Sequence, residues 1–333
     1  TFPPDGPVSP GAAEGLLFRV NRFLVAFTDD TRNPDLLMKA AETAGRAGLA
    51  DRALETAQRL VTSYPSSRWA APAKRVIGQT LFDRHEYPAA ETAFRQALGT
   101  ATGPQAEALA TLAASALYQH AADQRARGKR EAAAAAFLTV ANDFPATALT
   151  PPALSEAADL ALGAGDRAGA KHVWTRLVGD YRDSPQSAMA LRQLAVLSER
   201  EGEVAKALDW YEALAARSDA PARDEIAWTM ADLAERGGLW PRAERALIPL
   251  SDRSDLAAPV ALQAGFRAAD AIARQGRTAE ARQRADATLD RYRAWRARRG
   301  AATELTHADS LAAAALLDLA DRRGAACAAV RLS

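Results

Sequence analysis

The chain has 333 residues with 42 basic and 41 acidic side chains, and aromatic residues make up 6% of it. Such balanced charge gives no global attraction to nucleic acid or to an anionic membrane. A single cysteine, Cys327, excludes an internal disulfide framework and a cysteine metal cluster. Alanine dominates the hydrophobic residues and no β-branched run suggests a sheet, so the composition favours closely packed helices, in several domains or in one elongated array.

The N-terminal residues divide into a linker and an apolar segment. Residues 1–15 hold four prolines and three glycines, which predicts a flexible linker. Residues 16–27 are apolar except for Arg19, Asn21 and Arg22, and they are too short and too charged to span a bilayer. We expect a capping helix within residues 16–33 that covers the open face of the helices after it in the chain. A membrane-proximal or partner-docking segment is the alternative.

From residue 34 onward a pattern recurs every 36 to 43 residues. It is anchored by seven alanines: Ala53, Ala90, Ala133, Ala170, Ala207, Ala243 and Ala281. Twelve residues earlier stand small residues: Ala41, Gly78, Ala121, Ala158, Ala195, Ala231 and Ala269. Five residues earlier stand the turn residues: Gly48, His85, Gly128, Gly165, Gly202, Gly238 and Gly276. Four residues later come Ala57, Phe94, Phe137, Trp174, Tyr211, Leu247 and Ala285.

Each copy of the pattern predicts two short helices around a tight turn. In residues 151–185, for example, Gly165 ends one amphipathic stretch and Asp166 can cap the next. Small residues let the two backbones approach closely, and the larger side chain of the last column fills the remaining gap. Neither helix can bury its apolar stripe alone, so neighbouring copies must cover it. The longest gap, before Ala133, predicts a longer first helix there.

These columns, with Pro65 and Pro145 ending two of the second helices, resemble the tetratricopeptide repeat over residues 34–299. The period of about 37 residues is longer than the family's period of about 34. The resemblance implies an all-α fold, a right-handed α-solenoid of about seven helix-turn-helix repeats. Residues 300–333 would then form a partial repeat or a C-terminal cap.

The junctions between repeats point to a cellular location. TSYPSS at 62–67, NDFPAT at 142–147 and GDYRDSP at 179–185 look like junctions of bacterial envelope repeat proteins. Similar families include the repeat lipoprotein of the outer-membrane β-barrel assembly machinery and the coordinator of the Tol-Pal system. This resemblance implies a periplasmic, non-catalytic protein-interaction scaffold, with a membrane-associated complex as one setting. The alternatives are a cytoplasmic location and the superhelical non-catalytic part of a larger enzyme, such as a cell-wall lyase.

No pattern indicates catalysis. The four histidines are scattered: His85, His120, His172 and His307. No two of them stand one helical turn apart and no HExxH occurs, which argues against a helical zinc site. The glycines around Gly165 lack the spacing of a dinucleotide-binding fingerprint. We therefore expect no enzyme activity, no cofactor and no metal.

A basic cluster near the end of the repeats has two interpretations. It consists of Arg277, Arg282, Arg284, Arg291, Arg293, Arg296, Arg298 and Arg299, with Tyr292 and Trp295 interleaved. Nucleic acid could bind such a surface. Cations near a helix C-terminus also complement its dipole, and Asp286 and Asp290 offset part of the charge. We favour the second interpretation, with an acidic protein partner ahead of nucleic acid among the functional ones.

In such solenoids the first helices line the concave face, where a protein or peptide ligand can bind. Beside Lys39, the candidate partner-binding residues there are Arg75, Gln79, Tyr118, Arg125, Arg192, Trp228, Asp232 and Phe266. The aromatic residues would anchor the ligand and the arginines would orient its carboxylates. Packing between helices is the alternative for each aromatic residue. Glu42 and Val76 stand where the chaperone-tail-binding members of the family carry asparagine, which argues against that function.

Overall fold

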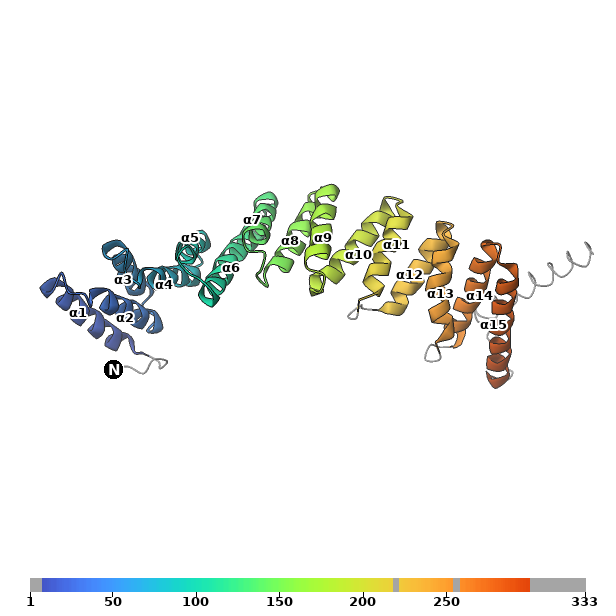
Figure 1. The fold of residues 1–333 in the computed structure, drawn as a ribbon, viewed down its shortest axis with the longest axis horizontal. Coiled ribbons are helices and arrows are strands. Elements are labelled where there is room, and N and C mark those ends of the chain that lie inside the picture. The colour runs from blue at the N-terminus through green and yellow to red at the C-terminus, as the bar shows by residue number, and fades with distance from the viewer. Residues whose placement is uncertain (1–7, 218–221, 254–257, 300–333) are drawn as a thin grey trace, which may run out of the picture. The chain divides into compact units, whose positions relative to one another are not determined.

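The computed structural model describes residues 8–217, 222–253 and 258–299, and over these ranges the chain is helical with no strand (Figure 1). The predicted all-α class is confirmed. The helices are α1 (Pro10–Ala26), α2 (Asn33–Arg46), α3 (Ala50–Ser63), α4 (Ala70–Asp83), α5 (Tyr87–Leu98), α6 (Pro104–Ala126), α7 (Arg130–Asp143), α8 (Thr150–Gly163), α9 (Arg167–Asp180), α10 (Pro185–Arg200), α11 (Val204–Ala215), α12 (Arg223–Arg236), α13 (Trp240–Asp252), α14 (Ala258–Arg274) and α15 (Thr278–Arg299).

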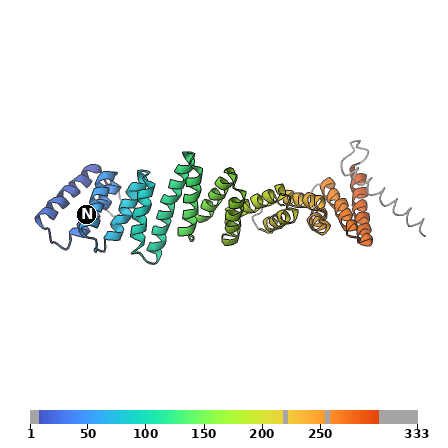
Figure 2. The same cartoon turned by 90° about the horizontal axis from the view of Figure 1, so that it is seen from above.

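The chain divides into two compact units, with the boundary between Ser187 and Ala188 inside α10. In the first unit each helix from α1 to α9 packs against the next one in the chain, and α2 also packs against α4. In the second unit the helices from α11 to α15 pack in the same sequential way. Figure 2 shows this stacking within each unit from a second direction. Within the two units these contacts include six helix pairs: α2–α3, α4–α5, α6–α7, α8–α9, α12–α13 and α14–α15.

The turn inside each pair is built on a residue with positive φ. The seven predicted turn residues have φ between +61° and +87°, and six of them are glycines. Glycine adopts this conformation without the steric cost that a Cβ brings. His85 is the exception, and its Nδ1 lies 2.7 Å from the hydroxyl of Tyr87. The turn column read from the sequence therefore corresponds to one repeated backbone conformation.

The packing columns lie in the core. All seven anchoring alanines are buried, as are the small residues of the first helices. Gly78 shows why one of these positions must be small, because a Cβ there would lie 2.6 Å from Cε1 of Phe94. Phe94 itself is fully buried. The predicted long first helix is also confirmed, since α6 has 23 residues against 14 in α4.

The N-terminal part differs from the prediction. The linker expected through residue 15 is wrong for residues 10–15, because α1 begins at Pro10. Proline is favourable in the first turn of a helix, and the hydroxyl of Ser9 accepts a hydrogen bond from the amide of Ala12 at 3.3 Å. The partial repeat expected at 300–333 lies outside the described residues, as do Cys327 and His307. Among the helices described, none is long and apolar enough to cross a membrane.

Candidate partner-binding groove

A groove of about 710 Å³ lies in the first unit, between the first helices of two neighbouring pairs, α2 and α4. Its lining residues come from both helices and from the residue before α4: Asp35, Met38, Lys39, Glu42, Thr43, Gly45, Arg46, Trp69, Arg75, Val76, Gln79, Thr80 and Asp83. We call this the α2–α4 groove. Three residues expected on the concave face, Lys39, Arg75 and Gln79, are brought together in it.

Helical periodicity explains why these residues face the groove. On α2 the lining residues recur every three or four positions, so they form one stripe. The opposite stripe, which includes Leu37, Ala40 and Ala44, is buried in the core. Met38 at 2% exposure forms part of the floor, whereas Lys39 and Arg75 are exposed at the rim. The groove thus has an apolar floor and a polar rim.

The charges at the rim are only partly compensated within the protein. Asp35 accepts hydrogen bonds from Arg68, at 2.8 Å, and from the indole of Trp69, and together they lower the pKa of Asp35. The amide of Gln79 donates to Asp83 at 2.8 Å. Lys39 and Arg75 form no ion pair within the described part of the chain, and neither do Glu42 and Asp83, which leaves two cations and two anions. The unpaired charges of the groove are therefore balanced in number, and the two cations stand on facing helices, Lys39 on α2 and Arg75 on α4.

Tyr118 and Arg125 meet around one carboxylate on the next helix pair. Arg125 of α6 forms an ion pair with Glu156 of α8. Burial raises the pKa of the Tyr118 hydroxyl, and the negative charge of Glu156 adds to this effect. The ring of Tyr118 packs edge-on against Phe137 with centroids 5.0 Å apart. Both residues thus already have contacts within the protein.

In the second unit, an arginine that the sequence analysis did not name contacts two of the candidate partner-binding residues. Arg267 of α14 lies 5.3 Å from the ring centroid of Trp228 and forms ion pairs with Asp232 and Glu235 of α12. The repeat period is a signal that could have found it, since Arg267 follows Asp232 by 35 residues. Arg192 is exposed on α10.

Phe266 does not face a groove, so its interpretation as a peptide anchor is wrong in this structure. It is 6% exposed and packs with Leu262 and Leu289 of the α14–α15 pair, and Tyr292 and Trp295 complete this cluster. Phe266 stands three residues before Ala269, the small residue at the helix crossing, so its side chain falls on the packing face. Position on a first helix alone was not a sufficient criterion for exposure.

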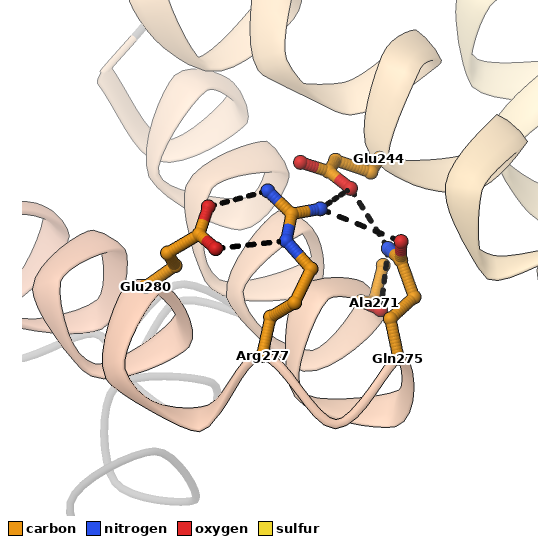
Figure 3. A network of polar contacts seen from close by, with 5 residues as sticks. All are labelled: Glu244, Ala271, Gln275, Arg277 and Glu280. Carbon is orange, nitrogen blue, oxygen red and sulfur yellow. Dashed lines mark hydrogen bonds and ion pairs between the residues drawn. The ribbon is translucent and has the colours of Figure 1, made fainter.

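Several arginines of the basic cluster have partners within the repeats. Figure 3 shows Arg277 between Glu244 of α13, at 2.6 Å, and Glu280, while the amide of Gln275 also donates to Glu244. Arg284 contacts Ser251 and Asp252, and Arg291 donates to the Ser251 carbonyl at 2.6 Å. These contacts favour a structural role for the cluster over nucleic-acid binding.

The described residues contain no group of three or more His, Cys, Asp or Glu side chains that could hold a metal ion.

Two tetratricopeptide repeat family models match the chain, one over residues 155–221 and the other over residues 35–67. These matches support the tetratricopeptide repeat superfamily as the origin of the repeats. No curated protein sequence matches the chain.

Several solved structures resemble the chain weakly. The pilF protein of Pseudomonas aeruginosa is 16% identical with a TM-score of 0.32, covering 65% of this chain and 90% of that chain. MamA is 23% identical with a TM-score of 0.31, covering 52% and 90%. A tetratricopeptide repeat protein from Parabacteroides merdae is 14% identical with a TM-score of 0.34, covering 85% and 98%. At these scores the similarity carries no functional argument.

Proposed function

We propose that this chain is a non-catalytic protein-interaction scaffold that binds an acidic peptide segment of a partner protein in the α2–α4 groove. Tetratricopeptide repeat proteins generally serve as scaffolds for protein–protein interaction. The observation that carries the proposal is the pair of exposed cations without ion-pair partners, Lys39 and Arg75, on facing helices of one groove.

Each part of the groove has a role in this proposal. Met38 and Val76 offer apolar contact for one side chain of the peptide. Lys39 and Arg75 donate charge-assisted hydrogen bonds to its carboxylates, which are stronger than neutral ones. The side-chain amide of Gln79 can form hydrogen bonds with the peptide backbone. Glu42 and Asp83 repel a carboxylate placed next to them, so the register of the acidic residues along the groove matters for affinity.

The test is a selection of phage-displayed random peptides on the purified chain. We expect the selected peptides to be enriched in Asp and Glu. A hydrogen bond to a charged group contributes about 1.5–3 kcal/mol, so Arg75→Gln and Lys39→Gln should each weaken a selected peptide by roughly tenfold to hundredfold. Isothermal titration calorimetry measures this loss.

The matched control is Arg130→Gln, which removes an exposed cation from the start of α7, outside the groove. It should leave the affinity unchanged. A cross-linking amino acid placed at Gln79 should capture the peptide, whereas the same amino acid at Gln58, an exposed glutamine on α3, should not. Equal weakening by all three charge variants, or capture from both positions, contradicts binding in the groove.

We propose further that the scaffold works in the periplasm of a bacterium, in an envelope complex. The envelope-type junctions at 62–67, 142–147 and 179–185 support this location. The test is fractionation of cells that express the full-length gene product at its native level. Recovery with cytoplasmic markers contradicts the proposal without affecting the groove.

A further inference from the structure

The exposed apolar surface of the described chain is concentrated at α1. Four large hydrophobic residues of the described chain are highly exposed. Three of them lie on α1 or directly after it: Phe18 at 64%, Val25 at 78% and Phe27 at 55%. The fourth is Met189, in the second unit. Isolated exposed hydrophobic residues are ordinary, but a group of them on one element marks an interaction surface.

One face of α1 is buried and the other is exposed. Ala13, Leu17, Val20 and Leu24 form the buried face, which packs into the core with α2. Phe18 and Val25 stand seven residues apart, so they lie on one stripe, and Arg22 stands between them. The guanidinium of Arg22 lies 5.9 Å from the ring centroid of Phe18. The outer face of α1 therefore combines apolar side chains with a cation beside them.

The cations of this face lie in its middle, and acidic residues stand at its two ends. Residues 14–29 contain Arg19 and Arg22, with the exposed acidic residues Glu14 and Asp29 at the two ends. Both arginines are exposed, and neither forms an ion pair in the described residues. A third cation, Arg59 of α3, donates to the side chain of Asn21 on α1 at 3.0 Å. Glu14 is the one acidic residue of α1, and it stands four residues before Phe18, at the N-terminal end of the same stripe.

We propose that the outer face of α1 docks reversibly on an anionic lipid surface, with the helix lying in the plane of the headgroups. Apolar side chains interleaved with arginines suit this boundary, because Phe18, Val25 and Phe27 can enter the acyl region while Arg19 and Arg22 reach the phosphates. A nucleic acid would use the cations but would leave the apolar groups in water. The docking surface is independent of the α2–α4 groove and of any peptide bound there.

The test is flotation of the full chain with vesicles of phosphatidylcholine alone or with about 30% phosphatidylglycerol. We expect binding to the anionic vesicles only, and release when salt rises from about 0.1 M to about 1 M. The double variant Arg19→Gln/Arg22→Gln should reduce partitioning roughly thirtyfold, because each basic residue near such a surface contributes about 1 kcal/mol. Phe18→Ser/Val25→Ser should reduce it more than tenfold.

Matched variants separate this surface from the rest of the molecule. Met189→Ser removes an exposed hydrophobic residue elsewhere, and Arg130→Gln/Arg167→Gln removes two exposed cations from the starts of α7 and α9. Both should bind anionic vesicles as the unchanged chain does. Circular dichroism melts should be the same for all variants, because every changed side chain is exposed.

Several results would overturn the proposal. One is equal binding to both kinds of vesicle, or to neither. Another is an equal loss in the control variants. A third is a dimer, detected by sedimentation, that the Phe18→Ser/Val25→Ser variant no longer forms, together with no vesicle binding by the unchanged chain. That result would assign the face to a second copy of the chain. Retention on RNA that depends on Arg19 and Arg22 but not on Phe18 would assign it to nucleic acid.

Discussion

Replacing Gly78 by alanine should destabilise the α4–α5 pair, even though alanine is the better helix former. The added Cβ would lie 2.6 Å from Cε1 and 2.7 Å from Cδ1 of Phe94, so it would clash with the ring. Phe94 is fully buried, and its ring can move only by displacing its neighbours. Overpacking of this kind costs about 1–3 kcal/mol, against about 1 kcal/mol gained in helix propensity. The free energy of unfolding should fall by about 0–2 kcal/mol.

Gly163 provides the matched control, because it also lies in a first helix and a Cβ there would meet nothing within 4 Å. Gly163→Ala should raise the free energy of unfolding by up to about 1 kcal/mol, since only the propensity term remains. The two variants should therefore differ by about 1–3 kcal/mol. Urea unfolding followed by circular dichroism measures the difference, and hydrogen exchange over residues 70–98 shows whether the loss lies in the α4–α5 pair.

A second substitution tests the contact itself. Phe94→Leu reduces the ring that Gly78 accommodates, so it should cost less in the Gly78→Ala chain than in the unchanged chain. Additive effects of the two substitutions, or equal stability of the Gly78→Ala and Gly163→Ala proteins, would refute the idea that this column is small because a neighbouring side chain fills it.

Three further predictions concern a turn, a carboxylate and two aromatic residues. Gly165→Ala should lower the free energy of unfolding by about 1–2 kcal/mol in urea melts, because φ is +87° there. The side chain and amide of Arg32 lower the pKa of Asp30 from 3.8 to about 2. The stability that this carboxylate contributes is thus present above about pH 4 and lost as the pH falls toward 2. Carboxyl NMR titration should show Arg32→Ala raising the pKa of Asp30 only part of the way to its ordinary value, because the backbone amide at residue 32 remains. Phe266→Ala should cost about 3–5 kcal/mol in thermal melts and Trp228→Ala clearly less, since only Phe266 is buried.

The backbone of the repeats was predictable because local chemistry determines it. A glycine five residues before a buried alanine specifies a positive φ, and the column even located the turn at His85, where glycine is absent. The start of α1 was not found, because prolines and glycines were read as helix breakers although Pro10 begins the helix. Element type followed from periodicity, whereas this boundary depended on a single cap.

The pairing of long side chains across repeats was not predictable in the same way. In the first-helix series, Arg125 pairs with Glu156 at a separation of 31 residues, and Arg236 pairs with Glu199 at 37. Several acidic residues lie at such distances from most arginines of the chain, so the sequence does not select one partner. Flexible side chains can also satisfy a charge within their own helix, as Arg127 does with Asp123.

The α2–α4 groove shows what decides between a paired and an available charge. Glu42 precedes Arg75 by 33 residues, a separation within the range at which arginines elsewhere in the chain pair with acids. Arg75 and Glu42 nevertheless form no ion pair, and both line a cavity of about 710 Å³. The separation along the sequence is therefore the same for these unpaired charges as for the paired ones. The space between α2 and α4 explains why Arg75 and Glu42 do not form an ion pair. That space depends on how neighbouring helix pairs pack, which is why Lys39 and Arg75 could be named from the sequence but their availability could not.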